Sequence, residues 1–174
     1  MIAVLRLGHR VERDKRLTTH VGLVARAFGA EIMYYTGDRD ETVERTIDEV
    51  VRRWGGSFRA DYVESWRNLL KQWPGKKIHL TVYGLPLRKV IDEVKALYIR
   101  GEQLLVVVGG EKVEGGVFRL ADFNVAITSQ PHSEAAALAV FLDWLQEGRE
   151  LERVYDDARI LVEPSERGKK IFKR

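Results

Sequence analysis

Short apolar segments and amphipathic segments alternate along almost the whole chain. The pattern predicts strands at residues 2–7, 31–36, 58–63, 77–84, 103–110, 124–128 and 159–164. Between them it predicts helices at 17–29, 41–54, 66–73, 86–98 and 134–147. The segment at 103–110 reads QLLVVVGG, a continuous apolar run typical of a strand buried on both faces of a parallel sheet. The expected fold class is therefore α/β, with a mostly parallel sheet flanked by helices.

Chain length and composition restrict the classes of protein that remain. With 174 residues and 20.0 kDa, the chain fits a single domain over 1–174, in which 149–174 form a C-terminal extension with a basic tail. The absence of cysteine excludes disulfides and thiolate metal sites, and four scattered histidines give no paired metal-ligand spacing, so no metal is expected. No apolar run approaches the ~20 residues of a membrane span, so we expect a cytoplasmic protein without a membrane partner.

Positive charge gathers at two places in a chain whose formal net charge is only +3. Residues 6–16 contain five Arg or Lys against two acids, and residues 166–174 contain five against one. If the fold brings these segments together, they form a surface that binds phosphates. The alternative is two solvated segments that keep the protein in solution, and the charge count leaves both open.

Three predicted strands end in irregular loops, at Gly84-Leu85-Pro86, at 109–116 and at 127–134. In a parallel sheet the carboxyl ends of the strands share one edge, where ligands bind. The loops are either ordinary turns or parts of a small-molecule site. The chain contains no G-x-x-x-x-G-K-[ST], G-x-G-x-x-G or G-x-S-x-G segment, which excludes a P-loop and disfavours a Rossmann-like oxidoreductase and the common α/β hydrolase.

Three segments resemble the motifs of a known superfamily. They are LRLGHRVERDKRLTTHVGLVARAFGA (5–30), VVVGGEKVEGG (106–116) and NVAITSQPHSEAAALAVFLDWL (124–145). Together they are similar to the SPOUT superfamily of S-adenosylmethionine-dependent RNA methyltransferases, and within it to the archaeal family that 2'-O-methylates a T-loop cytidine at tRNA position 56. The resemblance implies S-adenosyl-L-methionine as cofactor, tRNA as partner, a homodimer, and a deep trefoil knot near the C-terminus.

The resemblance also implies roles for individual residues. It places a cofactor site on three loops, formed by Leu85, by Gly109, Gly110, Glu111, Lys112 and Val113, and by Ile127, Thr128, Ser129, Gln130, Pro131, His132, Ser133 and Glu134. Arg26 matches an arginine at the reaction centre of related ribose methyltransferases. A guanidinium stays protonated, so we expect it to stabilise the developing alkoxide and not to act as a base. The alternative is that Arg26 has no role in the reaction and is a half-buried arginine whose side chain reaches solvent from its helix.

RNA contacts are expected in the loop after the first strand. The candidate residues there are His9, Arg10, Arg13 and Arg16. His20, in the helix that follows, is a further candidate, although it also fits an ordinary position at a helix start. The helix at 134–147 is apolar nearly all round, which predicts burial in a homodimer interface. The alternative to the enzyme is an RNA-binding protein on the same scaffold that has no catalytic activity.

Overall fold

The computed structural model describes residues 1–110 and 113–174. Its elements follow the chain in this order: β1 (Ile2–His9), α1 (Val11–Ala27), β2 (Ile32–Gly37), α2 (Glu41–Trp54), β3 (Arg59–Tyr62), α3 (Trp66–Gln72), β4 (Lys76–Pro86), α4 (Leu87–Ile99), β5 (Leu104–Gly109), α5 (Gly115–Leu120), β6 (Phe123–Ala126), α6 (Glu134–Gln146), the 3₁₀ helix η1 (Arg149–Glu152), β7 (Ile160–Glu163) and β8 (Lys170–Lys173).

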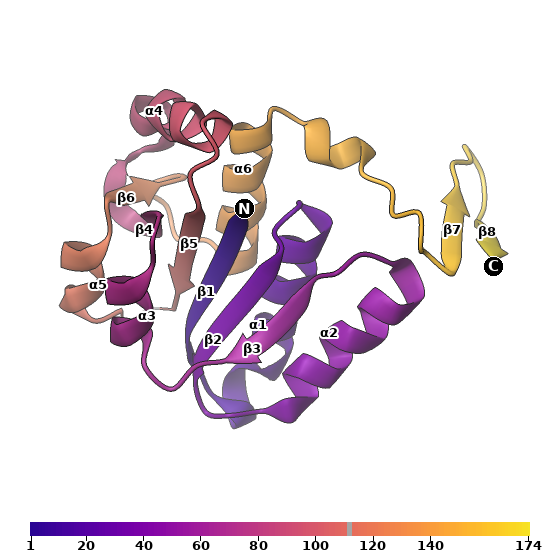
Figure 1. The fold of residues 1–174 in the computed structure, drawn as a ribbon, viewed down its shortest axis with the longest axis horizontal. Helices are drawn as coiled ribbons and strands as arrows, with labels where there is room; N and C mark the ends of the chain where they lie inside the picture. The colour runs from indigo at the N-terminus through magenta and orange to yellow at the C-terminus, as the bar shows by residue number, and fades with distance from the viewer. Residues whose placement is uncertain (111–112) are drawn as a thin grey trace.

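A six-stranded sheet forms the centre of the molecule (Figure 1). Its strand order is β3-β2-β1-β5-β4-β6, and every neighbouring pair is parallel. The expected α/β class with a mostly parallel sheet is confirmed. Because the strands run in one direction, the loops that follow them all leave from the same edge.

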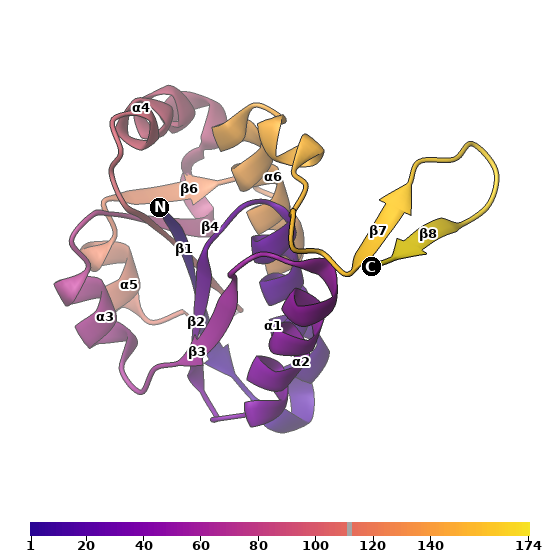
Figure 2. The same cartoon turned by 45° about the vertical axis from the view of Figure 1, so that its right-hand side comes forward.

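Helices cover the sheet unequally. The larger core lies under α1, α2, α4 and α6, and a smaller core lies under α3 and α5 on the other face (Figure 2). On β1, Ile2 and Val4 face the larger core, and Ala3 and Leu5 face the smaller one. This period of two places residue 6 of the same strand on the face of α1 and α6.

The pairing of β4 with β6 is interrupted by an arch in β4. Both Leu80 and Leu85 of β4 pair with Val125 of β6, so residues 81–84 arch away from the ladder between these two points. Gly84 lies at the return of this arch, where an added Cβ would be 2.5 Å from the carbonyl carbon of Asn124 and from the Val125 nitrogen. Only glycine allows the two backbones to approach so closely.

The first helix is longer than the sequence indicated. The helix was expected to begin at residue 17, but α1 begins at Val11, after the N-cap Arg10. The Val11 amide donates to Asp38 Oδ2 at 3.0 Å, from the loop between β2 and α2. That partner is 27 residues away, so the local sequence contained no sign of this helix start.

The C-terminal region departs from the sheet. The strand expected at 159–164 is present as β7, and it pairs antiparallel with β8, which the sequence reasoning read only as a basic tail. This hairpin projects from the body of the protein (Figures 1 and 2). The short α5 was also not foreseen. Within the described ranges no helix has both the length and the apolar character needed to cross a membrane.

Candidate functional site

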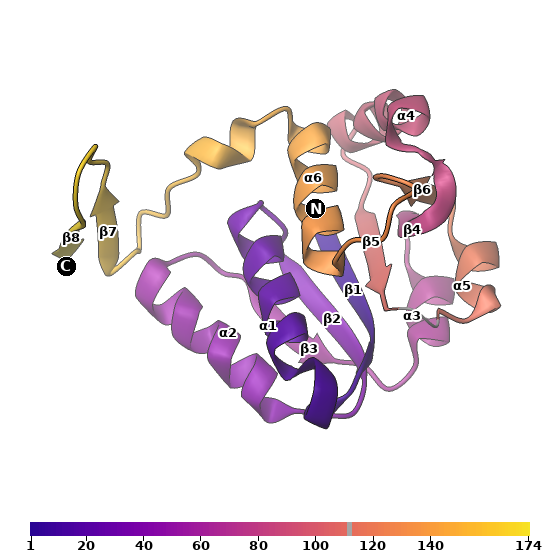
Figure 3. The ribbon, with the colours of Figure 1, turned by 180° about the vertical axis from the view of Figure 1, so that it is seen from behind.

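The three irregular loops do meet at one edge of the sheet. Leu85, Gly109 and Ile127 lie at the carboxyl ends of β4, β5 and β6, which are neighbours in the order β5-β4-β6. The loop at 127–133 leaves the edge strand β6 and ends at α6, which packs beside α1 (Figure 3). The loop therefore passes across the carboxyl ends of β4 and β5.

The glycine loop after β5 lies against both β1 and α6. An added Cβ on Gly109 would be 2.7 Å from Val113 Cγ2 and 3.3 Å from Leu7 Cβ, so protein atoms already fill that space. Gly110 is exposed, and its added Cβ would be 3.4 Å from Glu134 Oε1. Gly109 thus allows tight packing of the loop, and Gly110 leaves backbone accessible. The expectations for Glu111 and Lys112 lie outside the described residues.

The loop before α6 is polar and open to solvent. Its exposed members are Thr128, Ser129, Gln130, Pro131, His132 and Ser133. Thr128 Oγ1 accepts a hydrogen bond from the Gln130 amide at 3.2 Å, and Ser133 Oγ caps α6 by accepting from the Ala136 amide at 3.1 Å. Glu134, the first residue of α6, turns inward and is half-buried.

Apolar surface borders this polar loop. Leu85 is 59% exposed at the end of β4. A hollow of about 310 Å³ is lined by Pro86, Leu87, Arg88, Ile127, Val140 and Trp144. A second hollow, of about 400 Å³, is lined by Tyr83, Gly84, Leu85, Val90, Phe118, Asp122, Phe123 and Asn124. The edge therefore combines apolar side chains near β4 and β6 with the polar, exposed loop at 128–133.

A buried arginine that the sequence reasoning missed lies beneath the loops. Arg6 of β1 is only 2% exposed, and its Nη2 lies 3.6 Å from Asp14 Oδ2 and 3.8 Å from Glu134 Oε1. Burial lowers the pKa of Arg6, whereas the two carboxylates raise it. The sequence did hold a signal, because Arg6 shares a strand face with the buried Ile2 and Val4.

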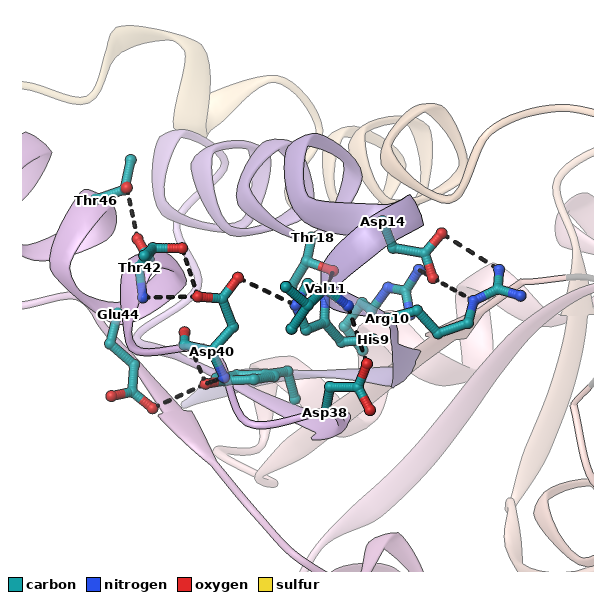
Figure 4. Close-up of polar contacts among 12 residues, drawn as sticks. His9, Arg10, Val11, Asp14, Thr18, Asp38, Asp40, Thr42, Glu44 and Thr46 are labelled. Atoms are coloured by element: carbon teal, nitrogen blue, oxygen red, sulfur yellow. Dashed lines mark hydrogen bonds and ion pairs between the residues drawn. The ribbon is translucent and has the colours of Figure 1, made fainter.

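A second buried polar cluster joins the starts of α1 and α2 (Figure 4). His9 is 1% exposed; its Nδ1 lies 2.8 Å from Thr18 Oγ1 and its Nε2 lies 3.4 Å from Asp40 Oδ2. Hydrogen bonds from Thr42 lower the pKa of Asp40, which caps α2. Burial raises the pKa of Tyr35, beside His9, to about 12. The His9 ring is enclosed by these contacts, and its expected contact with RNA stays a prediction.

The other expected RNA-contacting residues are exposed. Arg10 is the N-cap of α1, and Arg13, Arg16 and His20 lie on this helix. A loop was expected for Arg10, Arg13 and Arg16, and a helix for His20. Arg10 Nε donates to Asp14 Oδ2 at 2.8 Å, and this bond is the main reason that the pKa of Asp14 is lowered. Since α1 starts directly after β1, its first turns lie at the edge that carries the three loops.

Arg26 lies at the end of α1 that is remote from the three loops. It belongs to the last turn of α1, at the end nearest the start of β2. Its Nη2 donates to the Gly55 carbonyl at 2.6 Å, its guanidinium carbon is 4.9 Å from the centre of the Tyr155 ring, and the side chain is buried. The structure does not bring Arg26 to the loops, because α1 separates the two ends by 17 residues of helix.

Comparison with known proteins assigns this architecture to a family. The profile of the family described as "tRNA ribose 2'-O-methyltransferase, aTrm56" matches residues 54–172. The tRNA (cytidine(56)-2'-O)-methyltransferase of Methanopyrus kandleri is 56% identical over 97% of this chain and 94% of its own length. The protein of the same name from Pyrococcus horikoshii is 52% identical over 98% of this chain and 84% of its own length.

Solved structures share the fold at low sequence identity. The TrmH/SpoU tRNA modifying enzyme of A. aeolicus has a TM-score of 0.61 and 15% identity, over 87% of this chain and 76% of that one. The SpoU methyltransferase AviRb from Streptomyces viridochromogenes, in complex with AdoMet, has a TM-score of 0.60 and 16% identity, over 88% of this chain and 59% of that one. With relatives above half identity and a family profile spanning most of its length, this chain belongs to the aTrm56 family of tRNA ribose 2'-O-methyltransferases.

Proposed function

We propose that this protein transfers the methyl group of S-adenosyl-L-methionine to the 2'-hydroxyl of cytidine 56 in tRNA. The observation that carries the proposal is the meeting of three loops at one sheet edge beside the cationic start of α1, in a chain of this family. Relatives that match almost the whole chain carry the name of this activity. As a tRNA-modifying enzyme, the protein would work in the cytoplasm.

The residues at the edge fit the cofactor. The exposed Leu85 and the half-buried Ile127 offer apolar surface to a purine, and the open loop at 128–133 offers backbone amides and carbonyls to polar groups. Gly110 lets a ligand approach the backbone closely. S-adenosylmethionine, when bound, supplies a methyl group activated by its sulfonium charge.

The chain's own residues would orient the ribose and stabilise charge. The attacking 2'-oxygen has to lose its proton, so an alkoxide develops as the reaction proceeds. Guanidinium groups cannot take that proton but can bind the adjacent phosphates and stabilise the alkoxide. We assign this work to the exposed cations on α1, Arg13 and Arg16 with Arg10, because they share the edge with the loops. The contacts of Arg26 with the Gly55 carbonyl and the Tyr155 ring support a packing role for it within one subunit, and its place at the reaction centre stays a prediction.

The proposal includes a homodimer built on α6. This helix buries Leu138, Phe141 and Leu142 within its own subunit, which leaves a narrower exposed stripe than the sequence indicated. The stripe consists of Ala136, Val140 and Trp144, spaced four residues apart. It borders the hollow beside Ile127, so a second copy seated there would lie next to the cofactor loops.

The proposal also includes the knot and a single domain over 1–174, with 149–174 as an extension. Support for the knot comes from the arch of β4 at residues 81–84, whose Gly84 rests against the backbone of β6. The close approach of this arch to β6 fits a knot in which the C-terminal segment is threaded through a loop.

The test is methylation of an unmodified tRNA transcript with methyl-labelled S-adenosylmethionine, followed by mapping of the label. Incorporation at the ribose of cytidine 56, and none into a transcript carrying a 2'-deoxycytidine there, is the expected result. Tight binding of tRNA without incorporation would instead identify an RNA-binding protein on this scaffold.

A further inference from the structure

Arg6 is a charged side chain placed where charge is costly. It belongs to the central strand β1, is 2% exposed, and its Nε lies buried with no hydrogen-bond partner among residues 1–110 and 113–174. Placing a guanidinium there requires compensation by opposite charge. Two carboxylates provide it, Asp14 from α1 and Glu134 from the start of α6, and the Leu7 carbonyl accepts from Nη1 at 2.5 Å.

Glu134 connects this buried charge to the loops at the sheet edge. It is the last residue of the loop at 127–134 and the first residue of α6. Its Oε1 lies 3.8 Å from Arg6 Nη2 and 3.4 Å from the place a Cβ would take on Gly110. One carboxylate therefore lies between the strand beneath the edge and the open side of Gly110 in the loop after β5.

The Asp14 side of the cluster holds Arg6 in place. Asp14 is buried, and it also accepts hydrogen bonds from Arg10, at 2.8 Å to Nε and 3.3 Å to Nη2. Two guanidinium groups and two carboxylates thus form a neutral cluster that joins α1, β1 and α6. A contact of this kind resists movement, because breaking it leaves an unpaired buried charge.

We propose that Arg6 is a positioning residue for cofactor binding: paired with Asp14, it fixes Glu134 and so holds the loop at 127–134 against the Gly110 backbone. The inference rests on the proposed function, since it concerns the same cofactor site. Arg6 itself is enclosed beneath the loops and acts through Glu134 without touching the ligand. Loops that bind a ligand lose less conformational entropy on binding when the protein already holds them in place.

The test compares S-adenosylmethionine affinity among variants of the full chain by isothermal titration calorimetry. Glu134→Gln keeps the shape and removes the charge, and Arg6→Met removes the guanidinium. Each should weaken binding about tenfold or more, as losses of supporting contacts do. The matched control is Glu147→Gln at the other end of α6, which removes an exposed ion pair with Lys95 and should leave affinity unchanged.

Two further readouts separate positioning from general stability. Hydrogen exchange in 127–133 should quicken in Glu134→Gln, whereas exchange in β2 and β3 and the affinity for tRNA should match the wild type. The double variant should bind no more weakly than the weaker single variant, because both changes break one contact. If Arg6→Met does not fold, Glu134→Gln and a conservative Arg6→Lys, which should restore part of the affinity, still decide the question.

Wild-type affinity in Glu134→Gln, or additive losses in the double variant, would overturn the proposal. Additive losses would mean that Glu134 touches the cofactor directly and independently of Arg6. A wild-type protein that does not bind S-adenosylmethionine at all would instead refute the proposed function, so the two failures are distinguishable.

Discussion

Replacing Arg26 by Met tests whether this arginine serves chemistry or packing. The substitution keeps the apolar stem and removes the guanidinium, which bonds to the Gly55 carbonyl at 2.6 Å and faces the Tyr155 ring at 4.9 Å. A hydrogen bond from a charged group contributes about 1.5–3 kcal/mol, and a partly buried cation–π contact about 1 kcal/mol. The expected loss of unfolding free energy is therefore about 3 kcal/mol.

For a chain of this size, that loss lowers Tm by roughly 6–12 °C. Thermal and urea unfolding measure the stability, and methyl incorporation into tRNA is assayed well below the lowered Tm. The expected result is lower stability with methyl transfer retained. The matched variant Arg16→Met changes an exposed arginine of the same helix. It should leave stability within about 0.5 kcal/mol of the wild type and reduce tRNA binding, with a smaller salt dependence.

The opposite result would refute the reasoning. If Arg26→Met keeps the wild-type unfolding free energy but loses methyl transfer, then Arg26 reaches the reaction centre in a conformation other than this one. The contacts with Gly55 and Tyr155 would then not describe its working state.

Three other changes test the fold, the electrostatics and the assembly. Gly84→Ala should lower the unfolding free energy by about 3 kcal/mol, because its Cβ would lie 2.5 Å from the Asn124 carbonyl carbon, whereas Gly115→Ala, with 3.6 Å of clearance, should not. The pKa of Asp40 is held below its ordinary value of 3.8, so its stabilising contribution is present above that pH and is lost as the pH falls through the lowered pKa. Asp40→Asn should therefore make the unfolding free energy, measured with urea, depend less on pH on the acid side. Trp144→Glu should convert a dimer to a monomer in light scattering, because it places a charge in the exposed stripe of α6.

Each of these has a clear contrary outcome. Equal stability of the Gly84 and Gly115 variants would mean that β4 and β6 have room for a side chain at Gly84. If the unfolding free energy of Asp40→Asn depends on acid pH as in the wild type, then Asp40 does not contribute to that pH dependence. A wild-type protein that is already monomeric would refute the proposed dimer.

Much of the architecture was readable from the sequence, because hydrophobic periodicity is a local property. The apolar run at 103–110 became the buried strand β5, and the helix expected at 41–54 became α2, which buries Val43 and Ile47. Parallel strands separated by helices also determined that the loops after β4, β5 and β6 would meet at one edge.

Contacts between residues distant in sequence were decided only by the tertiary structure. Arg6 is compensated by Glu134, and Arg26 by Gly55 and Tyr155, across separations that no periodicity reveals. Such contacts also enclosed His9, which the sequence placed among surface residues, by setting Thr18 and Asp40 around its ring. The sequence determined which segments are strands and helices, since that depends on near neighbours. Which charges are buried, and which face the substrate, depends on how those segments pack.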